Sequence, residues 1–588
     1  MFNDGTTIET KLKGGNYYVD TKIDIIDGQM FFKFPYNKKL IEEIKARFER
    51  RKWHGFDEEN PRKIWSAPIT QRNIFQLRYL QGKYADINPY DKFDKDISLV
   101  RDEVIKYCKI TNRPVYSHQV DMICAALTTH EFYWACEMGT GKTLAAFIVM
   151  EMSGIKEWFW LGPKSALRQT YYELHKWNCA ISPTFYTYEG LKSVIENWPE
   201  DFPAPEGLIC DEGVKVKTPT AQRSVAVKHL ADSMREDHSD VYIGLLSGSP
   251  APKSPADWYW QTEIVCPGFL RERNIHDFKH RLSLVEEREK FAGGGAYPHL
   301  ITWWNDSKKC KICGETKDHA KHQSFSMEEE THTFEPSQNE VANLYKRMKG
   351  LVTVKFKKDC LDLPEIVYDV ITVPPTMEIL QAAKIIAAKG DSVIKTLIAL
   401  RELSDGFQYV QENKGARQVI EVPCPKDDVI IEQLDLHFDI GRLNIYAGFT
   451  ASIDRIIKIC HKLRWNTLRV DGRGWLGQTF NGDILPDKKL LELYDSGNDR
   501  YVFVGQPGAA GMGLDLSASP TTLFYSNDYN ASSRIQAEAR GHRIGMSEHG
   551  GRIIDIIHLP SDKYVLDNLQ AKRDLQHLTL TGIQQSLE

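Results

Sequence analysis

The alternation of hydrophobic and polar positions divides the chain into stretches of different character. Within the first hundred residues, strand-like patterning over 17–34 runs into a helical pattern over 38–51, where apolar residues recur at spacings of three and four. From about residue 105, short apolar runs alternate with helical patterns, and each run ends at a turn or a polar cluster. A second series of this kind begins near residue 440. Buried parallel strands that feed loops give such a pattern, so we expect an α/β protein with two lobes built on parallel sheets.

Composition fits a multi-domain globular protein. A length of 588 residues predicts roughly three to four units of ordinary size, and 42% hydrophobic with 26% charged residues is a typical balance. No run approaches the roughly eighteen apolar residues of a membrane span, and the N-terminus lacks the layout of a secretion signal. Most of the 11 cysteines lie inside apolar runs. We therefore expect a soluble, cytoplasmic protein in a reducing compartment, with no membrane partner.

Charge restricts the function only slightly. The net charge of −5 argues against a surface coated in positive charge. Nucleic acid is still an acceptable partner, because a motor needs only a basic groove between its lobes, and the charge of a whole chain does not reveal a groove.

The sharpest local signal is the segment Glu137–Thr143, EMGTGKT, directly after an apolar run. A strand, a glycine-bearing loop and Gly-Lys-Thr at the start of a helix form a phosphate cradle for ATP. Lys142 is expected to contact the β- and γ-phosphates and the Thr143 hydroxyl to bind Mg²⁺. A chance turn is the alternative interpretation. The residues expected to hold the nucleotide here are Gly139, Thr140, Gly141, Lys142 and Thr143.

An acidic pair, Asp211 and Glu212, ends a second apolar run. Loops at the carboxyl ends of parallel strands carry active sites, so we expect Asp211 to hold Mg²⁺ and Glu212 to deprotonate the attacking water. An ordinary surface pair is the alternative. Ser247 and Ser249 follow a further strand, where the hydrolysis site is expected to communicate with the second lobe, although serines are also common in plain turns.

Three polar residues of the second lobe share one face of a predicted helix. Gln536, Arg540 and Arg543 recur at intervals of four and three. An arginine supplied across a cleft stabilises the charge that develops on a transferred phosphoryl group, so we expect all three to serve catalysis. A solvated basic face is the alternative. The glycines of 507–516 suit a loop that touches phosphate, and Gly513 and Asp515 are expected to contact the nucleotide.

With these residues in hand, the chain resembles superfamily 2 helicases and, within them, the Swi/Snf family of DNA translocases. The similarity extends over about residues 105–575, with motifs in family order. They are Arg113–Gln119, Leu161–Trp177, Thr187–Leu191, Asp211–Gln222, Ser247–Tyr259, Lys357–Glu365, Asn444–Ile456 with Arg469–Gly472, Ala509–Ser519 and Asn527–Gly545.

This resemblance implies a fold, a reaction and further site residues. It implies RecA-like lobes, with Gln119 reading adenine and DNA contacts at Pro163, Lys164, Ser165 and Thr187. The implied domains are an N-terminal accessory domain at 1–100, an ATP-binding lobe at 105–275, an insertion at 276–365, a second lobe at 366–560 and a C-terminal brace at 561–588, whose helical pattern over 562–578 is expected to pack across both lobes.

The N-terminal segment is similar to the HARP-type domain of annealing helicases, which bind branched DNA. This small α+β domain mixes basic and aromatic residues, and cations with stacking rings suit a junction or a single strand. The expected DNA contacts are Lys52, Trp53, Arg62 and Trp65. The alternative is that the tryptophans form the core of the domain.

A polar stretch inside the insertion carries a candidate zinc site. Cys310 and Cys313 are followed by His319 and His322, and two thiolates with two imidazoles complete a tetrahedral Zn²⁺ site. The second pair is spaced more tightly than in common zinc fingers, and His332 is an alternative ligand. Unligated surface residues are the competing interpretation.

Together these features predict a DNA-dependent ATPase that uses ATP and Mg²⁺ and translocates on, or anneals, double-stranded or branched DNA. Within the same class, a strand-separating DNA or RNA helicase is the alternative. Outside that class, the alternative is a non-hydrolysing DNA-binding scaffold, against which the intact Lys142, Asp211, Glu212 and Arg543 argue.

Overall fold

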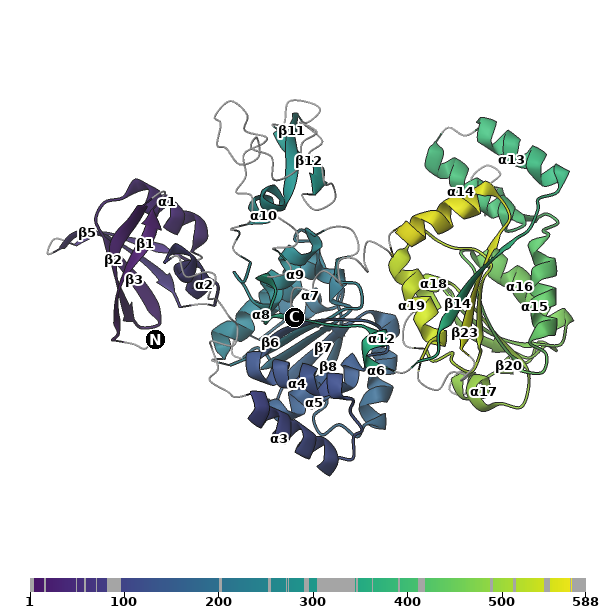
Figure 1. Cartoon of the computed structure of the whole chain (residues 1–588), viewed down its shortest axis with the longest axis horizontal. Helices are drawn as coiled ribbons and strands as arrows, with labels where there is room; N and C mark the ends of the chain where they lie inside the picture. Colours follow the sequence, from purple (N-terminus) through teal and green to yellow (C-terminus); the bar gives the residue numbers. More distant parts are fainter. Residues whose placement is uncertain are drawn as a thin grey trace.

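The computed structural model contains a small N-terminal domain, a first α/β lobe and a second α/β lobe, which follow one another along the long axis (Figure 1). The structure describes residues 5–573 except 15–16, 49, 58–59, 70, 82–96, 200–202, 239, 252–254, 271, 273, 290–295, 304–343, 345–346, 362, 390–391, 411–417, 487–489, 511–513, 544–549 and 572. No helix among these residues is long and apolar enough to cross a membrane.

The N-terminal domain is a five-stranded antiparallel sheet with two helices. The stretch predicted as strand becomes the hairpin β2–β3, because Asp27 and Gly28 both adopt the positive φ values, 50° and 68°, that a tight hairpin turn needs. Strand β3 alternates buried and partly buried residues, so one face of the sheet forms the core. The sheet order is β1-β2-β3-β5-β4. The elements are β1 (Thr7–Gly14), β2 (Tyr17–Ile26), β3 (Gln29–Phe34), α1 (Lys38–Arg47), β4 (Lys52–Asp57), β5 (Asn60–Pro68) and α2 (Gln71–Leu80).

The first lobe is a six-stranded parallel sheet with helices on both faces. Strand β6 is buried on both sides: Tyr133 and Ala135 face one core cluster, and Phe132, Trp134 and Cys136 face the other. Sheets of this kind give the continuous apolar runs seen in the sequence. The elements are α3 (Ile97–Ile110), α4 (Ser117–Thr129), β6 (Glu131–Cys136), α5 (Lys142–Ser153), β7 (Trp158–Gly162), α6 (Lys164–Lys176), β8 (Thr184–Thr187), α7 (Leu191–Glu196), β9 (Gly207–Asp211), α8 (Gln222–Asp237), β10 (Tyr242–Leu246), α9 (Asp257–Val265) and α10 (Ile275–Leu282).

The sixth strand of this sheet comes from a distant part of the chain. After the hairpin of β11 (Ser283–Glu289) and β12 (Ala296–Trp303), the strand β13 (Val352–Lys355) pairs in parallel with β6, giving the order β13-β6-β10-β9-β7-β8. The first lobe therefore does not end near residue 275, as the domain boundaries drawn from the sequence had it. A strand this short, after a long insertion, is not visible in hydrophobic periodicity.

The second lobe has an eight-stranded sheet in the order β14-β23-β22-β17-β21-β18-β19-β20, parallel except for the β18–β19–β20 meander. The short helix α12 (Lys357–Cys360) connects β13 to its first strand. The elements are β14 (Ile366–Thr372), α13 (Met377–Lys389), α14 (Val393–Ser404), β15 (Phe407–Val410), β16 (Gln418–Glu421), α15 (Lys426–Leu436), β17 (Arg442–Tyr446), α16 (Thr450–Lys462), β18 (Asn466–Asp471), β19 (Gly474–Gln478), β20 (Ile484–Leu485), α17 (Leu490–Ser496), β21 (Tyr501–Gly505), α18 (Pro507–Ala510), β22 (Thr521–Phe524), α19 (Ala531–Gly541) and β23 (Gly551–Ile557). The structure thus confirms the predicted α/β class, with two lobes on parallel sheets.

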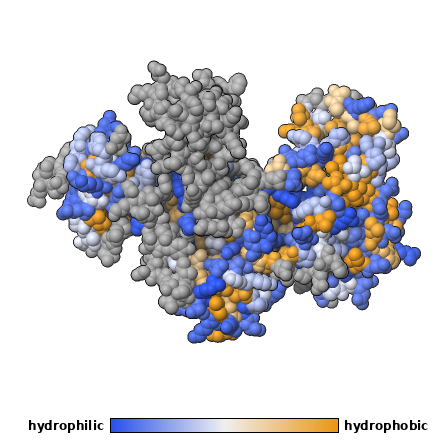
Figure 2. Space-filling view, viewed as in Figure 1, coloured by the Kyte–Doolittle hydropathy of each residue, from blue (hydrophilic) through white to orange (hydrophobic). Residues whose placement is uncertain are grey.

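The surfaces of these parts differ in polarity. In Figure 2 hydrophilic residues dominate the visible face of the N-terminal domain, whereas hydrophobic residues are frequent on the second lobe. Exposed apolar residues on α13 and α14 include Ile385, Val393 and Ile394. Several apolar side chains of the second lobe are therefore exposed and do not pack in its core.

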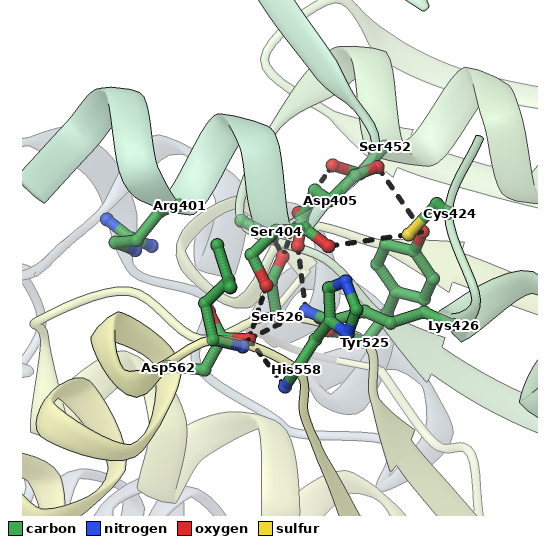
Figure 3. Close-up of polar contacts among 12 residues, drawn as sticks. Arg401, Ser404, Asp405, Cys424, Lys426, Ser452, Tyr525, Ser526, His558 and Asp562 are labelled. Atoms are coloured by element: carbon green, nitrogen blue, oxygen red, sulfur yellow. Dashed lines mark hydrogen bonds and ion pairs between the residues drawn. The ribbon is translucent and has the colours of Figure 1, made fainter. Parts of the chain in front are cut away.

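The C-terminal helix, residues 560–571, is anchored to the second lobe by a buried charge cluster (Figure 3). The Lys426 ammonium lies 3.0 Å from Asp405 Oδ1 and 3.1 Å from Asp562 Oδ2; Lys426 and Asp405 are fully buried, and Asp562 is largely buried. Ser452 and Ser526 each donate to Asp405 Oδ2 at 2.6 Å. Burial opposes the charged form of Lys426, but the two aspartates outweigh it and raise its pKa. The cluster therefore joins five segments of the second lobe that are spread along the chain between Asp405 and Asp562.

Replacing Lys426 with methionine is expected to destabilise the second lobe by about 3–5 kcal/mol, because it leaves Asp405 and Asp562 as uncompensated buried carboxylates. The measurement is urea unfolding followed by fluorescence. Lys458→Met is the matched control, since Lys458 pairs with Glu421 in an exposed ion pair and should shift the midpoint little. Equal midpoints for the two variants would contradict a stabilising role for the cluster.

Candidate active site

The predicted phosphate loop lies between β6 and α5. Gly139 and Gly141 adopt φ values of 86° and 80°, which only glycine takes up readily, and Gly141 caps α5. Lys142 Nζ donates to the carbonyl oxygens of Cys136, at 2.7 Å, and Glu137, at 3.0 Å. Thr140 Oγ1 also donates to Glu137 O, at 2.8 Å. The loop is thus wrapped around the lysine ammonium at the N-terminus of a helix, an arrangement that suits anions.

The start of α4 holds this loop from the side. Gln119 Nε2 donates to Gly141 O at 3.2 Å, and His118 Nε2 lies 2.9 Å from Thr140 O. A Cβ atom on Gly141 would lie only 2.0 Å from Gln119 Nε2, so the close approach requires glycine. The structure therefore places Gln119 against the loop. Its predicted contact with adenine stays a prediction.

The acidic pair lies at the end of β9. Asp211 closes the strand, and Glu212 follows in a left-handed conformation with φ of 53°. Burial raises the pKa of Asp211, while the charges of Lys142 and Arg540 oppose the shift. Burial and then the neighbouring Asp211 raise the pKa of Glu212 to about 7. A carboxylate tuned to neutral pH is suited to accept a proton from water.

Both predicted arginines of the second lobe interact with carboxylates of the first, Arg540 with this acidic pair and Arg543 with another residue. Arg540 lies near the end of α19, and burial and then Arg543 lower its pKa to about 9, opposed by the charges of Glu212 and Asp211. Burial also lowers the pKa of Arg543, opposed by Asp515 and by Glu173 of the first lobe. Gln536 is buried on the same helix. Both arginines thus interact electrostatically with carboxylates of the opposite lobe.

A second contact crosses between the lobes at the serine turn. Ser247 Oγ accepts a hydrogen bond from Ser249 N at 3.2 Å. Ser249 Oγ lies 3.4 Å from Ser532 Oγ on α19. The turn after β10 therefore touches the helix that carries Arg540.

The donor set fits a nucleotide and its metal ion. Lys142 and Arg540 interact electrostatically with the Asp211 and Glu212 carboxylates, and burial works against the charge of both Arg540 and Arg543. A bound polyphosphate chain would offset the free-energy cost of burying these charged arginines. The Asp211 carboxylate and the Thr143 hydroxyl are the oxygen ligands that Mg²⁺ prefers. Lys357, which the sequence placed only in a connecting segment, also enters this charge cluster.

The predicted DNA contacts lie in two regions. Pro163 and Lys164 follow β7, and Thr187 ends the neighbouring strand β8, so all three lie at one edge of the sheet. In the N-terminal domain Lys52 is exposed and Trp53 is 42% exposed, whereas Trp65 is 8% exposed and belongs to the core. Of these two tryptophans, Trp65 therefore forms part of the domain core, as the alternative interpretation had it, and Trp53 is the exposed one.

Several predicted residues lie outside the described part of the chain. They are Gly513, Cys310, Cys313, His319, His322 and His332, together with the side chains of Ser165 and Arg62. Among the residues that are described, no group of three or more histidine, cysteine or acidic side chains is placed to hold a metal ion. Zinc therefore stays a prediction.

Sequence comparison finds relatives for part of the chain. Human lymphoid-specific helicase is 24% identical over 136 residues, 23% of this chain and 15% of that protein. Human chromatin-remodeling ATPase INO80 is 26% identical over 141 residues, 24% of this chain and 8% of the relative. Mouse chromodomain-helicase-DNA-binding protein 1-like is 32% identical over 115 residues, 19% of this chain and 13% of the relative. No family model matches.

Among solved structures, a SWI2/SNF2 ATPase core from Sulfolobus solfataricus in complex with dsDNA covers 80% of this chain and 94% of its own, at 16% identity and a TM-score of 0.32. The sequence relatives confirm the resemblance to the Swi/Snf family. The chain matches 15% or less of the length of each of those three relatives. The HARP-type resemblance stays a prediction.

Proposed function

We propose that this chain is an ATP-hydrolysing motor that moves along double-stranded or branched DNA. One observation carries the proposal: Arg540 of the second lobe is close enough to interact electrostatically with Asp211 and Glu212 of the first lobe, as Lys142 of the phosphate loop also does. Such a site is complete only while the two lobes are together. The names of the relatives, a helicase and a chromatin-remodeling ATPase among them, agree with this function.

In this proposal each residue has a separate task. Lys142 would exchange the carbonyl oxygens of Cys136 and Glu137 for the β- and γ-phosphates, and Thr143 and Asp211 would hold Mg²⁺. Glu212 takes the proton of the attacking water, and Arg540 and Arg543 stabilise the charge that develops on the γ-phosphoryl group. Bound Mg²⁺ neutralises phosphate charge during the transfer.

Hydrolysis becomes movement because the site spans both lobes. Loss of the γ-phosphate removes the anion that Arg540 and Arg543 share with the first lobe, so the lobes separate. The contact between Ser249 and Ser532 provides a second route by which the first lobe affects α19. Pro163, Lys164 and Thr187 contact the DNA backbone, so binding is largely independent of sequence and weakens with salt.

The N-terminal domain is proposed to recognise branched DNA, as in annealing helicases. Trp53 packs against Trp65 at a tilt, with ring centroids 5.1 Å apart, and is 42% exposed next to Lys52. An open indole ring with a neighbouring cation suits an unpaired base at a junction.

The test is steady-state ATP hydrolysis without DNA and with single-stranded, plain duplex and forked duplex DNA. Strong stimulation by duplex or fork is expected, and Lys142→Ala should abolish it because the phosphates lose their lysine ligand. Lys156→Ala, which changes an exposed lysine of the same lobe, should leave the rate unchanged. Trp53→Ala should reduce the preference for the fork and leave the response to plain duplex.

Other outcomes would assign a different function. No hydrolysis under any of these conditions would favour the non-hydrolysing scaffold. Stimulation by RNA or single strand alone would favour another group of helicases. Release of a labelled strand from a forked duplex would show strand separation.

A further inference from the structure

Lys357 lies where the chain passes from the first lobe to the second. It opens the short helix α12, directly after β13 of the first lobe and shortly before β14 of the second. Its backbone N donates to Glu137 Oε2 at 2.7 Å, and Glu137 N donates in turn to Lys355 O at 2.9 Å. The connection between the lobes is therefore bonded to the first residue of the phosphate loop.

The side chain of Lys357 reaches across the loop to the second lobe. A Cβ atom on Gly139 would lie 3.0 Å from its Cε and 3.6 Å from its Nζ, so the lysine lies directly over that glycine. Its ammonium donates to His542 O at 2.9 Å. His542 lies between Arg540 and Arg543, so one side chain touches both the phosphate loop and the arginine segment.

The electrostatic surroundings of this ammonium favour an anion. Burial, and after it the charges of Arg543, Arg540 and Lys142, lower the pKa of Lys357 to about 8, while the charge of Glu137 opposes the shift. The partner on Nζ is a neutral carbonyl. Hydrogen bonds from an ammonium to phosphate oxygens are stronger than those to a carbonyl.

We propose that Lys357 is a fourth cationic ligand of the triphosphate, and that it turns from the His542 carbonyl to a phosphate oxygen when the nucleotide binds. This inference rests on the proposed function and deepens it, because it makes the connection between the lobes part of the nucleotide site. Breaking the Lys357–His542 bond on binding releases the arginine segment to close on the same phosphates. Through Lys357, binding of the triphosphate at the phosphate loop thus affects the arginine segment of the second lobe.

The experiment compares nucleotide binding by full-length variants. Lys357→Gln keeps a side-chain donor for the His542 carbonyl but removes the charge, whereas Lys357→Arg keeps the charge. Lys358→Gln is the matched control, because Lys358 is the adjacent residue and is exposed. The probes are a non-hydrolysable ATP analogue and inorganic triphosphate, titrated by calorimetry with Mg²⁺ present, and thermal melting without ligand checks the fold.

We expect Lys357→Gln to weaken binding of both probes by about 10- to 100-fold, as for the loss of a hydrogen bond to a charged group. Lys357→Arg should stay within a few-fold of wild type and Lys358→Gln within twofold, with unchanged melting midpoints. Binding by Lys357→Gln within twofold of wild type would overturn the inference. If wild type binds the analogue and Lys142→Ala does not, the proposed nucleotide site stands even when this inference fails.

Discussion

Replacing Arg540 with alanine is expected to lower kcat for ATP hydrolysis by about 10³- to 10⁵-fold, the contribution of an arginine that stabilises the charge of a transferring phosphoryl group. The reason is positional. Arg540 reaches the acidic pair from the opposite lobe, and burial with the nearby Arg543 lowers its pKa to about 9. Such a group gains most when negative charge develops next to it, so the effect should fall on kcat and leave the affinity for the ATP analogue within a few-fold.

The measurement is single-turnover hydrolysis in the presence of duplex DNA. Arg552→Ala is the matched control, since Arg552 lies on β23 of the same lobe and pairs with Asp369 at the surface. A hydrolysis rate for Arg540→Ala within tenfold of wild type would show that Arg540 does not stabilise the transition state. A large loss of analogue affinity would instead assign Arg540 to ground-state binding.

Replacing Glu212 with glutamine is expected to lower kcat by about 10²- to 10⁴-fold with nucleotide binding retained, the usual loss when a general base is removed. The same residue should set the pH dependence of the wild type. Burial and Asp211 raise the pKa of Glu212 to about 7, so the carboxylate is increasingly protonated as the pH falls through that value. Because only the ionised form accepts a proton, kcat/KM should level off about one unit above this pKa, fall to about half at the pKa and decline towards tenfold per unit well below it.

Two measurements check this expectation: kcat for the variant and a pH profile of kcat/KM for wild type between pH 5.5 and 8.5. Glu189→Gln changes an exposed carboxylate of the same lobe and serves as the control. A wild-type profile of kcat/KM that is flat from pH 6 to 8 would show that Glu212 is not the group that accepts the proton. So would full activity of Glu212→Gln.

The grouping of the candidate site residues was largely predictable from sequence because the segments that carry them are short and local. A glycine-lysine-threonine turn and an acidic pair each follow directly from their own apolar strand, and the carboxyl ends of parallel strands meet at one edge. Arg540 was predictable from its spacing with Gln536 and Arg543 on one helix. Each of these patterns lies within about ten consecutive residues, so it can be recognised without knowledge of long-range contacts.

Long-range pairing was not predictable in the same way. The strand β13 has only four residues, and what makes it part of the first lobe is its pairing with β6. Lys357 gains its place over Gly139 only through that pairing. In the N-terminal domain, β4 and β5 pair Trp53 with Trp65, yet only burial by the rest of the core decides which ring is exposed. Neither the register nor the burial is encoded locally.

The pairing of β13 with β6 also has a consequence for synthesis of the chain. Glu137 and Lys357 are 220 residues apart, so a ribosome must release the whole insertion before the sheet beneath the phosphate loop is complete. Until then β6 has an open, apolar edge, and unpaired edges of this kind invite aggregation. The nascent first lobe is therefore open to edge-to-edge association until residues 352–355 have been made, and a fragment that ends near residue 282 would lack this edge strand.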